Sequence, residues 1–332
     1  MAGIGRLIPG LLILLVVGLL ARALTAVVPI DSHLVVVIIV GALLGNTVGV
    51  PERATAGVET HGLWLETGIV LMGASVALDR LIEAGGLLLL VVVGTVCVTV
   101  LTVEILSRSV LEIPEKLGSL LAAGSGICGV SAVAAVAGSI DPDRRQIAYA
   151  AATVLLFDAI TLVVYPVIGR ALGLSDVVFG VWAGATMFST GPVTAAGFAY
   201  SQPAGEWAVL VKLARNALIG AVAIGYAIYY ARRGEGDSIE GNRVVYLWQT
   251  FPKFIVGFLA LLLVANLGVF STAQIAVIEN ASNWLFLVAF AGLGLSIDVR
   301  EFRNAGFKPA AVVFASLLVV STLVLLVLRT VL

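Results

Sequence analysis

Charged residues are scarce in this sequence. Only 12% of its 332 residues are Asp, Glu, Lys or Arg, whereas soluble domains carry about 25%, and 60% are hydrophobic. A soluble surface cannot be built from so apolar a chain, whose mean hydropathy is +1.11. The net charge of −1 leaves no basic field that would attract a nucleic acid. The composition therefore excludes a soluble protein and predicts no nucleic-acid partner.

Cysteine and histidine are almost absent. The two cysteines, Cys97 and Cys128, lie inside apolar runs, where they act as small packing residues. The two histidines, His33 and His61, have no metal-ligand spacing. No combination of nucleophile, base and orienting group is evident either. The sequence thus predicts no metal, no cofactor and no enzymatic activity.

Long polar stretches are also missing. The longest, residues 231–249, is a linker by composition and is too short to fold alone. The rest is a succession of apolar runs near the roughly 20 residues that a helix needs to cross a bilayer, without the alternation of barrel strands. We expect an all-α, polytopic membrane protein forming a single transmembrane domain over residues 1–332. About eleven transmembrane helices are expected, at 7–26, 33–50, 63–79, 85–106, 117–139, 145–171, 176–200, 205–231, 251–271, 274–297 and 307–330.

Lys and Arg in the short loops set the expected orientation. If the N-terminus is inside, the inner loops hold more of these residues than the outer loops, although Arg144 and Arg145 oppose this locally. The bias predicts a multi-pass protein of the cell inner membrane with a cytoplasmic N-terminus. The first run, with its basic flank at Arg6, also fits a cleaved signal peptide. Because similar runs recur to the end of the chain, we interpret it as the first transmembrane helix.

Two short motifs occur twice. Residues 73–79 (GASVALD) resemble residues 292–298 (GLGLSID), and Asn46 has a counterpart in Asn266 one helix earlier in each case. The copies lie seven helices apart, and an odd offset places them in opposite orientations. This pattern predicts an inverted-topology repeat of the kind that many secondary transporters have. The repeat-like halves would be about 33–171 and 176–332.

Two of the expected helices are poorly suited to a continuous form. The fifth is rich in glycine and serine around Ser125–Gly129, and the seventh contains Gly191 and Pro192. Glycine costs a helix interior about 1 kcal/mol relative to alanine, and proline removes a backbone donor. We expect residues 125–129 and 190–194 to be non-helical and close together near mid-membrane. The alternative is close packing of small residues at helix interfaces.

Broken helices expose backbone amides that bind anions and carbonyls that bind cations. The candidate substrate-binding residues of these two segments are Ser125, Gly126, Ile127, Cys128, Gly129, Ser131, Ser189, Thr190, Gly191 and Thr194.

Charged side chains also occur within the apolar segments. Lys212, Arg215 and Asn216 have the i, i+3, i+4 spacing of one helix face, and we add them to the candidate substrate site. Burying a basic group at a span centre costs about 2.5–3.5 kcal/mol, although Lys212 could reach an interface. Asp158 lies at a similar depth in the sixth segment. It either forms a structural ion pair with Arg215 or carries protons as an ion-coupling residue.

Neither broken segment contains a carboxylate. A cation–proton antiporter is expected to place Asp or Glu there, because a bound cation needs a compensating charge. The two basic residues after the second broken segment suit a bound anion better than a bound cation.

Four stretches carry a family resemblance: SGICGVSAVAAV (125–136), VWAGAT (181–186), VTAAGFAYSQPAGEWAVLVKLAR (193–215) and AGLGLSIDVREFRNAGFKP (291–309). They are similar to the YeiH-type family, often labelled sulfate exporters, and the resemblance covers nearly the whole chain. That family resembles the sodium–proton antiporter and bile-acid symporter folds. The resemblance therefore implies a panel domain and a core domain in which two discontinuous helices cross.

One stretch departs from the family pattern. After WAGAT the family usually has Ile-His-Asp-Thr-Ala-Gln-Val, whereas here residues 187–193 are Met-Phe-Ser-Thr-Gly-Pro-Val. The missing His and Asp imply different coupling or specificity, for which Asp158 would compensate. The crossing helices of this fold run antiparallel, but the fifth and seventh segments are two apart and would run parallel. Either the tenth segment is the partner of the fifth, or one span is miscounted.

The leading hypothesis is a secondary-active transporter that moves a small anion, such as sulfate or a related oxyanion, by alternating access, and that exports it if the family label holds. A cation–proton antiporter or sodium-coupled symporter of the same fold is the second hypothesis, and a non-transport membrane enzyme or scaffold is the third. The expected partners are the small anion and membrane lipid. Coupling to H⁺ or Na⁺ and assembly as a homodimer remain open.

Overall fold

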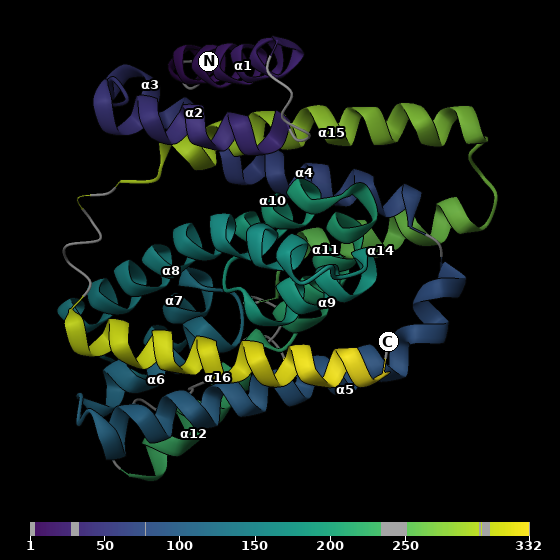
Figure 1. Cartoon of the computed structure of the whole chain (residues 1–332). Helices are drawn as coiled ribbons and strands as arrows, with labels where there is room; N and C mark the ends of the chain where they lie inside the picture. Colours follow the sequence, from purple (N-terminus) through teal and green to yellow (C-terminus); the bar gives the residue numbers. More distant parts are fainter. Residues whose placement is uncertain are drawn as a thin grey trace. The chain divides into compact units, whose positions relative to one another are not determined.

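The computed structural model describes residues 4–27, 33–76, 78–233, 251–298, 300 and 306–331. All regular elements in these ranges are helices, so the predicted all-α class is confirmed (Figure 1). Helices pair their backbone polar groups internally, as an apolar chain in lipid requires. The expected linker 231–249 lies outside the described residues except for 231–233.

Six helices in the described ranges are long and apolar enough to cross a membrane. They cover Gly5–Thr25, Leu88–Val110, Arg144–Ala171, Gln202–Arg232, Thr272–Leu295 and Phe307–Val331. Other apolar stretches form helices that are too short to cross alone. The helices therefore fit a multi-pass membrane protein, whereas the number of eleven spans stays a prediction.

The chain forms two compact units. The first comprises Met1–Ala84, Phe198–Gln202 and Lys253–Val299. Its helices are α1 (Ile4–Val27), α2 (His33–Thr47), α3 (Glu52–Val58), α4 (His61–Met72), the 3₁₀-helix η1 (Gly73–Ser75), α14 (Lys253–Asn266) and α15 (Thr272–Leu295).

Close helix packing in this unit depends on small residues. A Cβ atom on Gly41 of α2 would lie 2.8 Å from the carbonyl oxygen of Ala291, and one on Gly45 would lie 2.6 Å from that of Leu295. Both contacts are too short for any side chain. The two glycines, one helical turn apart, let α2 approach the backbone of α15 as small residues do between membrane helices.

The two repeated asparagines make matching contacts. Asn46, near the end of α2, donates from Nδ2 to the carbonyl of Ile297 at 2.6 Å, and Asn266, at the end of α14, donates from Nδ2 to that of Val76 at 2.9 Å. Each amide also donates to the carbonyl four residues earlier in its own helix. The asparagine that precedes one motif copy thus binds the other copy.

The second unit comprises Gly85–Gly197, Pro203–Pro252 and Arg300–Leu332. It contains most of α5 (Leu78–Ile105), the π-helix η2 (Leu106–Val110), α6 (Glu115–Gly126), α7 (Val130–Ile140), α8 (Arg144–Ala171), α9 (Asp176–Thr186), most of α10 (Thr190–Tyr200), α11 (Gln202–Asn216), α12 (Ile219–Arg232) and α16 (Phe307–Val331).

Glycines also position α11 within this unit. A Cβ atom on Gly180 or Gly184 of α9 would lie 2.6 Å from the carbonyl oxygen of Ala204 or Ala208, respectively. The helices therefore touch along their backbones, and the N-terminal half of α11 is held against α9.

Candidate functional site

The fifth expected segment is broken, as predicted, between α6 and α7. Residues 127–129 are non-helical, and Gly129 has φ +69°. A positive φ suits glycine, which lacks a Cβ atom. The prediction was wrong for Ser125 and Gly126, which form the last residues of α6. The break lies at the end of the glycine-rich stretch rather than at its centre.

The seventh expected segment is also broken, but not where predicted. Residues 187–189 separate α9 from α10, whereas residues 190–194 are helical and form the start of α10. Pro192 lies in the first turn of α10, where its missing N–H removes a group that has no helical partner anyway. The proline therefore starts a half-helix instead of interrupting one. Met187 and Phe188, which are not among the predicted site residues, lie at the break itself.

Lys212 joins the two breaks. Its side chain is fully buried, and Nζ donates to the carbonyl of Ile127 at 2.5 Å, to that of Met187 at 3.1 Å and to that of Phe188. These carbonyls are free because α6 and α9 end just before or at these positions. The C-terminal end of a helix carries about half a negative charge, which stabilises the ammonium group.

Arg215 makes the same connection one turn later on α11. It is also fully buried, and its guanidinium donates to the carbonyl of Gly126 at 2.7 Å, to that of Met187 at 2.5 Å and to that of Ser125. The planar group donates in fixed directions to both half-helices. Lys212 and Arg215, termed the cation pair below, thus hold the ends of α6 and α9 together.

Asp158 of α8 lies at the second break. Its side chain is 3% exposed, and Oδ1 accepts a hydrogen bond from the backbone N–H of Ser189 at 2.9 Å. A carboxylate at the start of α10 is favoured by the positive end of the helix. Within the described residues Oδ2 has no hydrogen-bond partner.

The structural ion pair considered for Asp158 and Arg215 is not formed. Salt bridges join Arg108 to Glu104 and Glu115, and Arg233 to Glu115, but none joins Asp158 to Arg215 in the described part of the chain. Asp158 instead binds a backbone amide, while Arg215 binds only backbone carbonyls. Each side chain bonds to backbone groups at the breaks and not to the other side chain, so that alternative was wrong.

The remaining candidate residues differ in how closely they approach the breaks. Asn216 is buried and donates from Nδ2 to Oγ1 of Thr190 at 3.0 Å. Thr194 donates to the Thr190 carbonyl at 2.7 Å, within its own helix. Cys128 is a buried free thiol in the first break, whereas Ser131, in the first turn of α7, is exposed.

The two breaks also touch directly. A Cβ atom on Gly129 would lie 2.0 Å from Oγ of Ser189, so only glycine leaves room for that hydroxyl. Polar atoms near the breaks remain without a hydrogen-bond partner among the described residues, namely Oγ of Ser125 and Oδ1 of Asn216 in addition to Oδ2 of Asp158. Gly191 lies beside Thr190 in the first turn of α10.

Comparisons with known proteins place the chain in a family. A family model described as conserved hypothetical protein 698 matches residues 9–313. Similar proteins, each called UPF0324 membrane protein, occur in Nitratidesulfovibrio vulgaris (32% identical over 316 residues, 91% of this chain and 87% of the relative) and in Bacillus cereus (33% over 282 residues, 84% and 81%). A third, UPF0324 membrane protein Atu0671 of Agrobacterium fabrum, is 31% identical over 296 residues, 88% of this chain and 82% of the relative.

No solved structure matches the chain. The names of these relatives describe membrane proteins and give no substrate, so the sulfate-exporter label is not shown. Together with the long apolar helices, they establish a multi-pass membrane protein. The chain belongs to the conserved hypothetical protein 698 family of UPF0324 membrane proteins.

Proposed function

We propose that this protein is a secondary-active transporter of a small anion, such as sulfate or a related oxyanion, and that it works by alternating access. The observation that carries the proposal is a buried excess of basic over acidic side chains at the two helix breaks. Lys212 and Arg215 contribute two cations and Asp158 contributes one carboxylate. The partial charges of the four half-helix ends cancel. Each of the two N-termini carries about half a positive elementary charge, and each of the two C-termini carries about half a negative one. With all three side chains ionised, about one positive charge remains.

An unbalanced buried charge is costly, and a mobile counter-ion is one way to balance it. The N-termini of α7 and α10 supply amide donors for such an anion, and the hydroxyls of Ser125 and Thr190 lie next to the breaks. The cation pair occupies the freed carbonyls that would otherwise bind a metal cation. This arrangement supports an anion over Na⁺ as the transported species.

Proton coupling through Asp158 extends the proposal. Its Oδ2 is buried and without a hydrogen-bond partner in the described residues, so it can take up a proton without breaking a contact. Protonation would raise the excess charge at the breaks from about one to about two and strengthen anion binding. Proton uptake and anion uptake would then be coupled.

The two compact units are consistent with the architecture of such a transporter. The unit that contains both broken helices corresponds to the core domain, and the other corresponds to the panel. Asn46 and Asn266 each bind the motif copy that follows the other asparagine. This reciprocal contact supports an inverted repeat, because copies related by a two-fold axis make the same contact in both directions.

Ligand-dependent thermal stabilisation of the purified protein tests this proposal. Sulfate, sulfite, thiosulfate, carboxylates and Na⁺ are titrated at several pH values in a chloride-free buffer. A bound ligand stabilises by about 2.7 kcal/mol at one hundred times its Kd. We expect saturable stabilisation by an oxyanion and none by Na⁺. Stabilisation by Na⁺, with no response to any anion, would favour the sodium-coupled or antiporter hypothesis instead.

A further inference from the structure

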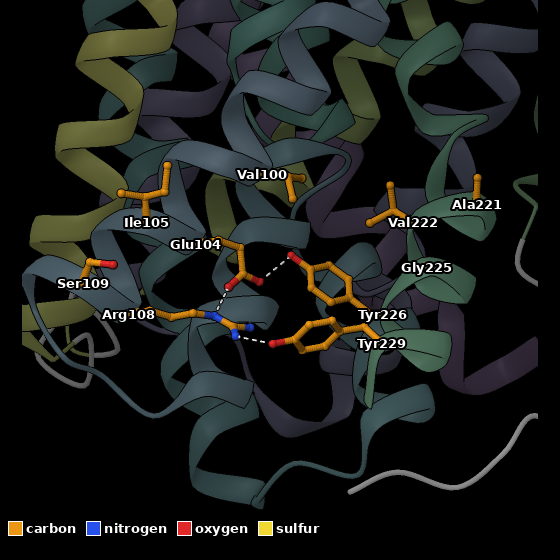
Figure 2. Close-up of a pocket in the computed structure, with 10 residues that line it drawn as sticks. All are labelled: Val100, Glu104, Ile105, Arg108, Ser109, Ala221, Val222, Gly225, Tyr226 and Tyr229. Carbon is orange, nitrogen blue, oxygen red and sulfur yellow. Dashed lines mark hydrogen bonds and ion pairs between the residues drawn. The ribbon is translucent and has the colours of Figure 1, made fainter. Parts of the chain in front are cut away.

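Lys212 is fully buried, and in the described part of the chain it has no carboxylate partner. Buried lysines are rare in proteins unless their charge is paired. Elsewhere in the second unit a partly buried cation does have such a partner. Figure 2 shows Arg108 and the Tyr226 hydroxyl, which donate to Glu104 at 2.5 and 2.7 Å beside a cavity of about 620 Å³. The ammonium of Lys212 bonds only to backbone carbonyls, as a free cation would.

Three carbonyl oxygens surround this ammonium. Nζ lies 2.5 Å from the oxygen of Ile127 and 3.1 Å from that of Met187, and it also bonds to that of Phe188. Ile127 directly follows α6, whereas Met187 and Phe188 directly follow α9. The three carbonyls, termed the carbonyl site below, thus come from the C-terminal ends of two half-helices, which carry partial negative charge.

The sequence leaves these carbonyls without helical partners. Pro192 has no N–H, so the carbonyl of Phe188, four residues earlier, cannot accept the usual helical hydrogen bond. Among the turn and loop hydrogen bonds of the described residues, none ends on the carbonyl of Ile127 or Met187. Buried carbonyls without a partner are costly. The carbonyl site therefore needs a donor or a cation to fill it.

The hydrogen bonds of Lys212 define the charge that fills the site. Each of the three carbonyls can only accept, so Nζ must supply three N–H groups, and a side-chain amine has three only as the ammonium. Arg215 donates to the same Met187 carbonyl at 2.5 Å. A second positive charge beside the guanidinium is tolerated at most as a single charge, which excludes a divalent ion.

We propose that Lys212 is a tethered cation and that the carbonyl site is a binding site for one compact monovalent cation. Unwound backbone carbonyls and the C-terminal ends of half-helices bind Na⁺ in transporters with broken helices, and carbonyl oxygens replace the hydration shell of K⁺ in channels. The inference rests on the proposed function, since it names the cation of the same site. Because this cation is covalently attached, anion binding by the wild type needs no dissolved Na⁺ or K⁺.

Replacing the lysine tests the carbonyl site. Lys212→Ala removes the ammonium and three methylenes and opens the site. The variant is purified and its Tm measured in the chlorides of Na⁺, K⁺, ammonium and methylammonium, with bulky N-methylglucamine as the reference at equal concentration. The Tm of Lys212→Ala should be several degrees higher in at least one compact cation than in the reference. Lys212→Met is the matched control, because its apolar side chain fills the same space without a charge.

The wild type and Lys212→Met should have the same Tm in all five salts. An equal Tm of Lys212→Ala in every salt, or the same cation response in Lys212→Met, would overturn the inference. Recovery of folded Lys212→Met but of no folded Lys212→Ala in any salt would also overturn it, because the site would then require volume rather than a cation.

The anion titration supplies a second measurement. In Lys212→Ala, the oxyanion that stabilises the wild type should act only when a compact cation is present. The wild type should respond to that oxyanion equally in Na⁺ and in N-methylglucamine, and a wild-type response that requires Na⁺ would overturn the tethered cation even if no variant folds. Failure of the wild type to respond to any anion contradicts the proposed function instead, and leaves the cation response of Lys212→Ala as the separate test of the carbonyl site.

Discussion

Lys212 and Arg215 lie three residues apart in α11, and their side chains end on carbonyls from two other helices. Their spacing predicted a shared face, and the depth of Arg215 in an apolar segment predicted its burial. The alternative that Lys212 reaches the interface was wrong, because its side chain is fully buried. The sequence could not predict that they bind carbonyls, because that depends on where α6 and α9 end. The cation pair contributes positive charge to the site and also fixes its backbone.

Replacing Arg215 tests both roles. Arg215→Gln removes the guanidinium that bonds to Ser125, Gly126 and Met187 and should cost about 3–5 kcal/mol of stability, the range for removing one partner from a buried charged arrangement. It should also abolish anion-dependent stabilisation in a thermal-shift titration. Arg215→Lys keeps the charge without the planar donor set and should restore either property only in part.

A double variant separates this account from a structural ion pair. If Arg215 only neutralised Asp158, combining Arg215→Gln with Asp158→Asn would recover stability and leave anion binding intact. Because the two side chains bind different backbone groups, we expect no such recovery. Retention of anion binding by the double variant would remove Arg215 from the site.

Asp158 gives a pH-dependent prediction. In the wild type, anion affinity should rise as the pH falls, because protonation removes the negative charge beside the second break. Asp158→Asn can still accept the Ser189 N–H bond and should therefore fold. Its anion affinity should be high and independent of pH in the same titration. A variant with unchanged pH dependence would contradict proton coupling, and one with lower stability alone would indicate a structural role.

At the scale of elements, composition predicted that two helices are discontinuous but placed the second break incorrectly. The glycine–proline pair predicted the centre of a break, whereas Pro192 belongs to the first turn of α10. Proline is compatible with the start of a helix and with an interruption, and local sequence does not distinguish the two. The close-packing alternative holds elsewhere, since Gly180 and Gly184 pack against α11 without interrupting α9.

The first break gives a prediction at this scale. Gly129→Ala places a side chain at φ +69° and against Oγ of Ser189, so Ser189 must move. The backbone strain alone is about 1–3 kcal/mol. Denaturation should show at least this loss, together with weaker anion-dependent stabilisation. Gly138→Ala in α7 is the control and should gain up to about 1 kcal/mol. Equal stability of the two variants would contradict the geometry of the break.

For the whole molecule, composition was sufficient to predict an all-α, multi-pass membrane protein, because apolar runs of this length permit little else. Composition could not predict which segments make up the two compact units, since the first unit joins the beginning of the chain to Lys253–Val299. The reason lies in contacts between distant segments, such as those of Asn46 with Ile297 and Asn266 with Val76. The repeat-like halves 33–171 and 176–332 stay a prediction.

The central claim is that the buried cation pair serves the movement of an anion across the membrane, and flux measurements in proteoliposomes test it most directly. The protein is reconstituted, and exchange of labelled sulfate and related oxyanions is followed with and without a pH gradient. The account predicts oxyanion exchange that is accelerated by a pH gradient, retained in Gly138→Ala and abolished in Arg215→Gln. Flux of Na⁺ or H⁺ that is independent of every anion offered, or oxyanion flux unchanged in a folded Arg215→Gln protein, would contradict it.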